Sequence, residues 1–524
     1  MAEEEKIMLE VEAKPALNAL FIDGNSLTLE QVLAVACKNM PVSLSVVGKA
    51  NLLRSRRLVE KIVEDGLTVY GVTTGFGKFS EVTVSREECN ELQKNIIMSH
   101  AGGVGRPLPR EAVRAMMLLR ANSLAKGYSG VRLEVVQLLL DMLNGGIHPV
   151  VPCQGSVGAS GDLVPLSHIA LAMIGLGEAE YQGRIMPAEE ALKQAHLKPV
   201  VLQAKEGLAL INGTQYMSAL GCLAVAQASK LAKGACIAAA MTFEALEGIP
   251  AAYSPLIHDV RPHAGQRTCA RAMRQLLEGS DLLEREKHAR VQDAYTLRCI
   301  PQVYGASLDA INHVRGVLET EINSATDNPL VFPDAGCVIS GGNFHGQPLA
   351  LALDYLALAV SELGSMAERR VERLVNPALN GQLPPFLTRH GGLNSGLMIL
   401  QYVTAALASE NKVLSHPASV DSIPTSANQE DHVSMGSIAA RKVGSVLENV
   451  SWVVAAEFLA AAQALDFAQH TPGLGSRIAH ALVREVVPHW DGDRILYQDL
   501  HRVHELLQSG GLVERVEQEI GPLW

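Results

Sequence analysis

The sequence predicts a mainly α-helical protein that is built around a bundle of long helices. Five long apolar segments are rich in alanine, and none of them alternates between polar and apolar residues as a strand does. Alanine has the highest helix propensity, and its small side chain lets helices pack closely. Because several segments exceed the usual length of a globular helix, they indicate a central bundle. These segments are residues 215–246, 306–324, 347–375, 397–414 and 432–469.

The composition supports this architecture. Of the 524 residues, 48% are hydrophobic, so we expect a large buried core or a large subunit interface. Only 19% are charged, below the usual share of about 25%, which indicates that surface is lost to oligomer contacts. The length allows roughly three to four domains, although one large helical fold can absorb them. We divide the chain into a mixed N-terminal region (1–215), a central bundle (216–472) and a C-terminal helical cap (473–524).

Charge, cysteine spacing and hydropathy disfavour several other classes of protein. The net charge is −11 without a basic run, so we expect no nucleic-acid partner. Eight scattered cysteines form no Cys-x-x-Cys pair, which disfavours a metal or redox site and fits a reducing cytoplasm. The acidic first residues lack the pattern of a signal peptide. The apolar stretches 349–360 and 453–465 contain acidic residues and are shorter than a membrane span of about 20 residues, so we expect buried helices and no membrane.

The N-terminal region is expected to combine short strands with helices. Residues 1–25 are predicted to contain short extended pieces. Thr28 and Gln31 have the spacing of a capping box, so a helix is expected to run from there to about Cys37. Further helices are predicted for residues 50–65, 91–98, 111–124 and 133–143, and amphipathic helices such as 493–507 are predicted for the C-terminal cap.

The rest of the chain is organised around the segment from Gly155 to Leu166. Glycines at every third position enclose two serines, which excludes a helix interior and disfavours a strand. A tight kink at Ala159-Ser160-Gly161 would bring the Gly161 amide nitrogen close to the Ala159 carbonyl carbon. If that nitrogen attacks and two waters leave, the tripeptide becomes a five-membered ring with an exocyclic methylidene. Such a ring is an electrophile that none of the twenty side chains supplies.

From the residues alone, this segment has other interpretations. A glycine-rich loop is more often an ordinary turn or a phosphate cradle. A P-loop would need Gly-Lys-Ser/Thr at its end, but Gly161 is followed by Asp162. A nucleophile elbow would need a glycine two residues after Ser160, and Asp162 stands there as well. A dinucleotide fingerprint would need a firm strand before it, which the prolines at 149 and 152 disfavour.

Other candidate positions also allow two interpretations. The loop of residues 70–77 is either a surface turn or a mobile loop that presents Tyr70 to a site. Asn212 fits a plain helix N-cap. Tyr295 and Arg298 share one helix face, as a surface stack or as a clamp for a carboxylate. His100 and Phe344 could be structural, and residues 425–434 could be a solvated first helical turn.

The run from Gly155 to Ser167 resembles the signature of the aromatic amino acid ammonia-lyases and aminomutases, and the resemblance recurs along nearly the whole chain. It implies a methylidene-imidazolone (MIO) group that forms autocatalytically from Ala159-Ser160-Gly161, without an external cofactor. It also implies a helical core of the fumarase/aspartase-like type. The expected assembly is a homotetramer whose active sites are shared between subunits.

The resemblance also implies roles for individual residues. Tyr70 would accept the β-proton of the substrate, with Tyr295 as the other candidate base. Because a free tyrosine has a pKa of about 10, the site must lower the pKa of Tyr70. Arg298 would hold the substrate carboxylate. The remaining counterparts line the MIO group or the substrate side chain: His100, Asn212, Gln292, Phe344, Met398 and Gln429.

Residues 425–434 resemble the histidine ammonia-lyases of this family most closely. Glu430 matches a glutamate that binds the substrate imidazole, and Met398 supports the same substrate. Thr73 and Ala264 depart from the usual histidine ammonia-lyase pattern of asparagine and proline. We therefore expect elimination of ammonia from L-histidine to give trans-urocanate. The alternatives are a tyrosine or phenylalanine ammonia-lyase or 2,3-aminomutase, and a non-catalytic structural homologue.

Overall fold

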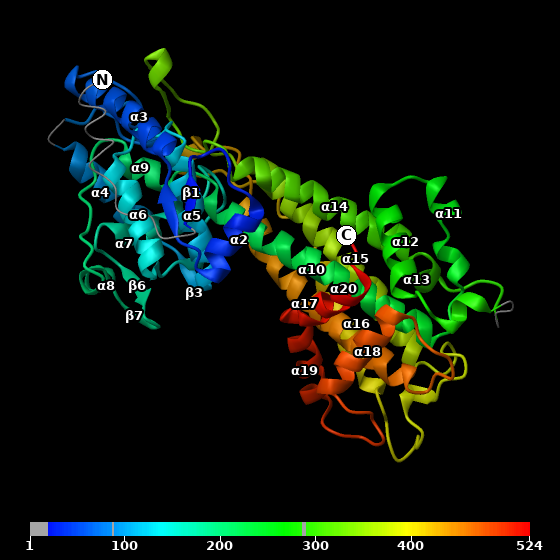
Figure 1. Cartoon of the computed structure of the whole chain (residues 1–524). Coiled ribbons are helices and arrows are strands. Elements are labelled where there is room, and N and C mark those ends of the chain that lie inside the picture. The colour runs from blue at the N-terminus through cyan, green and yellow to red at the C-terminus, as the bar shows by residue number, and fades with distance from the viewer. Residues whose placement is uncertain (1–18, 86–87, 286–289) are drawn as a thin grey trace. The chain divides into compact units, whose positions relative to one another are not determined.

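The computed structural model describes residues 19–85, 88–285 and 290–524, and most of these residues lie in helices (Figure 1). The predicted mainly α fold is therefore confirmed. The chain divides into two compact units, and each unit is assembled from three separate stretches of the chain. Unit 1 consists of Met1–Leu223, Gly316–Leu351 and Ala418–Arg441, and unit 2 consists of Ala224–Arg315, Ala352–Pro417 and Lys442–Trp524.

The five predicted long segments are all helical. They form α10 (Gln215–Ala245), α14 (Ile300–Glu321), α15 (Gln347–Val375), α16 (Met398–Leu414) and α17 (Gly436–Leu465). Four of them (α10, α14, α15 and α17) contain a boundary between the two units. The predicted division into three regions has no test here and stays a prediction.

Two of these helices differ from their predicted bounds for local reasons. Helix α14 begins at Ile300 rather than residue 306, because Pro301 is compatible with a first turn and Gly305 packs inside the helix. A side chain at Gly305 would lie 2.4 Å from the backbone nitrogen of Gln266. Helix α17 begins at Gly436 rather than residue 432, since Met435 has a φ of 56° and donates its backbone N–H to Val157.

Unit 2 has a closely packed helical core. Many alanines of α17, such as Ala455, Ala456 and Ala460, are fully buried, as expected for helices that approach closely. The core also encloses an ion pair, in which Glu457 accepts hydrogen bonds from the Arg370 guanidinium. The unit ends with α18 (Leu474–Val486), α19 (Leu496–Gln508) and α20 (Gly511–Ile520).

Unit 2 also contains helix α12 (Ala264–Leu276). Two shorter helices are α11 (Pro255–Asp259) and α13 (Tyr295–Arg298). Helices α15 and α17 are long and apolar enough to span a membrane by length and composition alone. In their most apolar windows, however, 67% and 72% of the residues are buried inside the protein, as in the core helices of a folded domain.

Unit 1 combines helices with short strands. The capping box at Thr28 is present, and α2 (Leu29–Lys38) follows it. Residues 1–18 lie outside the described residues, so of the extended pieces expected over residues 1–25 only β1 (Leu20–Ile22) is seen. The predicted helices are α3 (Val46–Glu64), α4 (Cys89–His100), α5 (Arg110–Ala125) and α6 (Leu133–Gly145), and α7 (Leu163–Met173), α8 (Ala188–Gln194) and α9 (Glu206–Ile211) follow.

Within the described residues of unit 1, the strands are three or four residues long and form four small sheets. The largest has the order β4-β6-β7 and is antiparallel, and its edge strand places His148 opposite Glu180. The other strand pairs are β1-β2, β3-β5 and β8-β9. Their bounds are β2 (Val42–Leu44), β3 (Val104–Pro107), β4 (Ile147–Pro149), β5 (Pro152–Gln154), β6 (Glu178–Tyr181), β7 (Arg184–Pro187), β8 (Leu330–Phe332) and β9 (Cys337–Ile339).

Candidate active site

The segment that contains Ala159-Ser160-Gly161 is a loop between β5 and α7. Gly155, Gly158 and Gly161 have φ angles of 126°, 66° and 72°, which L-amino acids other than glycine rarely adopt. Gly161 forms a parallel bridge with Gly213, and the Asp162 N–H donates to the Gly213 carbonyl over 2.7 Å. The regular spacing of glycines in the sequence therefore corresponds to three positions where the backbone requires them.

The loop is packed too closely for larger residues. A Cβ atom on Gly161 would lie 2.2 Å from the Gly213 carbonyl oxygen, and one on Gly158 would lie 2.4 Å from the Ser434 hydroxyl. Ser434 and Ser437 donate hydrogen bonds to the carbonyls of Gly158 and Ser156 over 3.1 and 2.6 Å. The loop is thus held rigidly from both sides, and the condensation considered above needs such a fixed kink.

The structure brings two predicted site residues into direct contact. The Ser160 hydroxyl donates to the Glu430 carboxylate over 2.7 Å, although the two residues are 270 positions apart. The second carboxylate oxygen of Glu430 accepts from the Thr425 hydroxyl over 2.6 Å. Ser160 and Glu430 are both half-buried. The residue predicted to bind an imidazole therefore touches the serine predicted to form the electrophile.

Asp162 follows directly after the tripeptide and is fully buried. One of its carboxyl oxygens accepts from the Met217 N–H over 3.0 Å, and the other has no partner in the described part of the chain. Burial raises the pKa of Asp162 to about 8, and the nearby Glu321 adds to this shift. The group is therefore a neutral acid at neutral pH. No sequence pattern indicates this neutral carboxyl, because only the fold shows that it is buried without a cation.

Tyr70 lies in a non-helical loop, as predicted, and is half-buried. Its hydroxyl accepts a 3.5 Å hydrogen bond from the Gly77 N–H. The pKa of Tyr70 was expected to be lowered, but this expectation is wrong for the residues described. Burial, together with the negative charges of Glu430 and Asp327, raises it instead, against the smaller effect of the Gly77 hydrogen bond.

Asn212 is buried, and the alternative interpretation of this residue as an N-cap of the long helix is wrong. It is the C-cap residue of α9, because α10 begins only at Gln215. Its amide donates to the Asn328 carbonyl over 3.2 Å, and its side-chain oxygen has no partner among the described residues. This oxygen is available to a further donor in the site.

His100 is the last residue of α4, two residues beyond the predicted end of that helix. Its Nδ1 lies 3.0 Å from the Ser99 hydroxyl, and burial lowers the pKa of the imidazole. Gln429 follows the short helical turn Ser426–Asn428 and is exposed. Phe344 lies in the loop before α15 and is half-buried.

The other four predicted residues, Gln292, Tyr295, Arg298 and Met398, belong to unit 2. Tyr295 and Arg298 are the first and last residues of α13, and the guanidinium carbon lies 4.5 Å from the centre of the Tyr295 ring. The Arg298 Nε donates to the Asp293 carbonyl over 2.9 Å. Its two terminal nitrogens have no hydrogen-bond partner in the described part of the chain, so they are available to a carboxylate. Met398 is the first residue of α16.

Comparisons with known proteins show the family of this chain. The family model described as aromatic amino acid lyase matches residues 27–485. A histidine ammonia-lyase from Caldanaerobacter subterraneus subsp. tengcongensis is 56% identical over 96% of this chain and 99% of that protein. A solved histidine ammonia-lyase from Trypanosoma cruzi has 46% identity and a TM-score of 0.89, covering 96% of both chains. Tyrosine aminomutase from Streptomyces globisporus has 38% identity and a TM-score of 0.91, covering 96% of this chain and 98% of that one.

Proposed function

The chain belongs to the aromatic amino acid lyase family, and we infer that it is a carbon–nitrogen lyase that eliminates ammonia from L-histidine to give trans-urocanate. The relatives named as histidine ammonia-lyases support this substrate over nearly the whole chain. The observation that carries the inference is the 2.7 Å hydrogen bond between Ser160 and Glu430. It joins the tripeptide of the electrophile to the residue that selects the substrate.

The residues of the loop fit the formation of an MIO group. The Gly161 nitrogen would bond to the Ala159 carbonyl carbon, and the carbonyl oxygen would leave as water with the amide protons of Ser160 and Gly161. The Ser160 hydroxyl would leave as the second water with the Ser160 α-proton. The left-handed Gly161 and its contact with Gly213 support such a kink. When present, the ring supplies an electrophilic carbon for the substrate amine.

Glu430 is suited to an imidazole substrate. A carboxylate offers about four lone-pair sites. The Thr425 hydroxyl uses one of them, and the Ser160 hydroxyl uses a second one until it leaves in the condensation. The remaining capacity can accept an N–H of the histidine ring. Arg298 would take a substrate carboxylate with its free terminal nitrogens, which can donate two parallel hydrogen bonds.

Proton removal is assigned to Tyr70, with Tyr295 as the second candidate. Because burial raises the pKa of Tyr70, its phenolate needs a positive charge nearby, and the substrate ammonium would supply one. The free side-chain oxygen of Asn212 would accept a hydrogen bond close to the reacting tripeptide. His100, Gln292, Phe344, Met398 and Gln429 are proposed to line the substrate.

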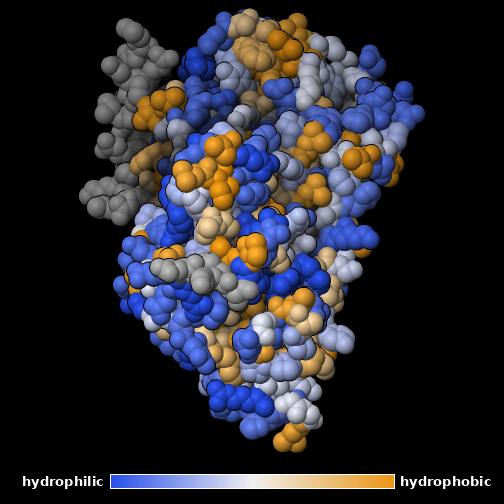
Figure 2. Space-filling view, turned by 90° about the vertical axis from the view of Figure 1, so that its right-hand side faces the viewer, coloured by the Kyte–Doolittle hydropathy of each residue, from blue (hydrophilic) through white to orange (hydrophobic). Residues whose placement is uncertain are grey.

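We also propose a cytoplasmic homotetramer with shared active sites, acting without nucleic acid or a membrane. The apolar surface of unit 2 supports an oligomer. Ile399, Tyr402 and Val413 of α16 have exposed fractions of 47%, 64% and 74%, and apolar side chains gathered on an exposed helix are typical of an interaction surface. Figure 2 also shows hydrophobic patches on one face of the molecule. A sedimentation experiment on the full chain tests this assembly.

A substrate panel with the Glu430→Gln variant tests the proposed reaction. Purified enzyme is incubated with histidine, tyrosine and phenylalanine, and the arylacrylate products are followed by ultraviolet absorbance. We expect turnover of histidine and a loss of roughly 10- to 100-fold in kcat/KM for Glu430→Gln, the worth of one charge-assisted hydrogen bond. The exposed Glu64→Gln is the matched control. Turnover of tyrosine alone, or a β-amino acid product, would favour the alternative lyases or aminomutases.

A further inference from the structure

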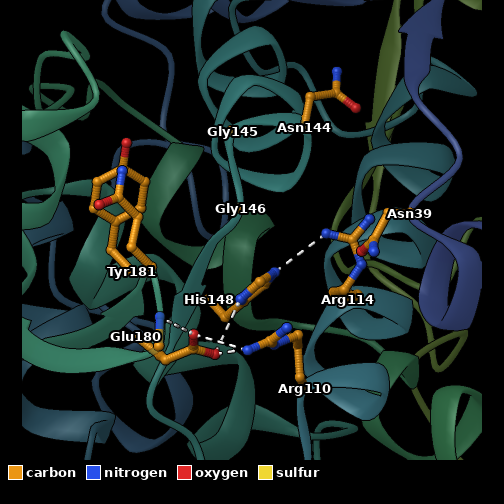
Figure 3. Close-up of a pocket in the computed structure, with 11 residues that line it drawn as sticks. Asn39, Arg110, Arg114, Asn144, Gly145, Gly146, His148, Glu180 and Tyr181 are labelled. Carbon is orange, nitrogen blue, oxygen red and sulfur yellow. Dashed lines mark hydrogen bonds and ion pairs between the residues drawn. The ribbon is translucent and has the colours of Figure 1, made fainter.

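Unit 1 contains a cavity that is lined by charged residues and is separate from the glycine-rich loop. Its volume is about 400 Å³. Helix α5 contributes two arginines to it, and the ends of α2 and α6 and the strands β4 and β6 complete the wall (Figure 3). We call it the arginine cavity, and the side chains that matter for the argument are Asn39, Arg110, Arg114, His148 and Glu180.

Arg114 is a buried cation with no acidic partner. Its side chain is only 3% exposed, and no ion pair involves it in the described part of the chain. Its Nε donates to the Val35 carbonyl over 3.0 Å, and its Nη1 donates to the Leu143 carbonyl over 2.9 Å. The Nη1 also lies 3.2 Å from His148 Nε2. The second terminal nitrogen, Nη2, has no partner among the described residues.

The one carboxylate of the cavity is already used. Glu180 accepts from the Arg110 Nε and Nη2 over 3.1 and 3.0 Å and from the Gly183 N–H over 3.0 Å. His148 Nδ1 lies 3.3 Å from it (Figure 3). Burial and the neighbouring Arg114 lower the pKa of His148, so the imidazole adds no positive charge at neutral pH. Glu180 therefore neutralises Arg110, and no carboxylate forms an ion pair with Arg114 in the described part of the chain.

A purely structural role explains only part of this arrangement. Val35 and Leu143 belong to the last turns of α2 and α6, so Arg114 joins two helix ends and balances part of their dipoles. That role accounts for its Nε and Nη1. It does not account for the unpartnered Nη2 or for a cavity of this size. A buried charge is normally paired, since leaving it alone is costly.

We propose that the arginine cavity binds a small anion that carries a carboxylate or phosphate group. Its oxygens would accept hydrogen bonds from Arg114 Nη2, the free Nη1 of Arg110 and the Asn39 amide. These donors come from two elements, so the anion would connect α5 to the end of α2. A planar guanidinium is well suited to either group, because it donates two parallel hydrogen bonds.

The position of the cavity relates it to the catalytic loop. His148 and Glu180 face each other across the β4-β6 pair. The chain between these two strands, residues 150–177, includes Ala159-Ser160-Gly161 and α7. Arg110 already joins α5 to this pair through Glu180, so an anion that also binds Arg110 would stabilise the part of unit 1 from which the catalytic loop extends. Binding would then raise the melting temperature of the enzyme.

Isothermal titration calorimetry on the full-length enzyme tests the proposal, with inorganic phosphate in one arm and succinate in the other at constant ionic strength. We expect saturable binding of at least one of them. Arg110→Gln and Arg114→Lys should weaken it about tenfold or more, since each removes a charge-assisted hydrogen bond. The exposed Arg184→Gln, on β7 but outside the cavity, should bind as the wild type does. The Arg298→Gln variant should also bind, because it alters only the proposed substrate-carboxylate site.

Each result of the titrations either identifies the class of the ligand or contradicts the proposal. Binding of phosphate alone identifies a phosphate ligand, and binding of succinate alone identifies a carboxylate ligand. No saturable heat in either arm, equal affinity in Arg110→Gln, or loss of binding in Arg298→Gln alone would overturn the proposal. If Arg114→Lys fails to fold, as judged by circular dichroism, the Arg110→Gln measurement decides, because Arg110 is half-exposed and does not connect helix ends.

Discussion

Two fully buried carboxyl groups in this chain have opposite surroundings. Glu457 in the helical core of unit 2 accepts from Arg370 Nη2 over 2.9 Å and from the Thr242 hydroxyl over 2.8 Å. Asp162 in the glycine-rich loop of unit 1 accepts from a backbone N–H, and its second oxygen has no partner among the described residues. The same chemical group is thus paired with a cation in one region and left without one in the other.

This difference separates a structural site from a reactive one. The charge of Arg370 and the hydrogen bonds around Glu457 satisfy the buried ion pair, so it contributes to a fixed core. At Asp162 burial raises the pKa to about 8, which leaves a proton donor one residue from the tripeptide that is proposed to condense. In the core, the buried polar groups bind one another. In the loop, one carboxyl oxygen of Asp162 has no partner among the described residues.

The largest expected effect comes from Gly161→Ala. A Cβ atom there would lie 2.2 Å from the Gly213 carbonyl oxygen, and the φ of 72° disfavours alanine. The kink and the condensation should both fail, with a loss of histidine turnover on the order of 10³-fold or more. Gly316→Ala in α14 is the matched control, because a Cβ atom there meets open space. Comparable activity of the two variants would contradict the required kink.

The second-largest effect is expected on the stability of the helical core of unit 2. Glu457→Gln leaves Arg370 buried without a counter-charge and should lower the free energy of unfolding by about 3–5 kcal/mol. The double variant Arg370→Met/Glu457→Leu should lose less, because no charge is then left alone. Urea denaturation followed by circular dichroism measures both. If Glu457→Gln were as stable as the wild type, the ion pair with Arg370 would not stabilise the core. The contrast between Glu457 and Asp162 would then be lost.

A smaller effect is expected in the pH dependence of stability. The pKa of Asp162 is raised from 3.8 to about 8 in the folded state. Between these values the unfolded chain releases the proton and the folded chain keeps it, so stability falls as pH rises. Asp162→Asn removes this dependence. The variant should therefore gain up to about 1.4 kcal/mol per pH unit relative to the wild type from pH 5 to 8.

Parallel denaturation series at pH 5, 6, 7 and 8 measure this difference. The exposed Asp421→Asn is a suitable control and should follow the wild type at each pH. A constant difference between Asp162→Asn and the wild type would show that Asp162 is already ionised in the folded enzyme. The contrast with Glu457 would then disappear.

The helices were predictable from local features. Alanine-rich apolar segments gave α10, α15 and α16 to within one residue at each end, and the Thr28 capping box is present. The exceptions depend on distant contacts. Helix α17 starts late because Met435 bonds to Val157, far away in the sequence. Most of the short strands were not predicted, because a strand of three residues is too short to show an alternation of polar and apolar side chains.

For the candidate site, the sequence indicated residues but could not indicate their contacts. The glycine spacing indicated a special backbone at residues 155–161, and the positive φ angles confirm it. No local pattern could place Ser160 against Glu430 or show that Asp162 is buried without a cation, because both depend on folding of the whole unit. For the same reason the raised pKa of Tyr70 was not foreseen. The roles of individual site residues stay predictions.

Mass spectrometry of the peptide that contains residues 159–161 tests the central claim most directly. Peptides from the active enzyme should be lighter than the sequence mass by two water molecules, and Ser160→Ala should give an inactive enzyme without that double loss. A peptide of full sequence mass, isolated from enzyme that converts histidine, would contradict the account.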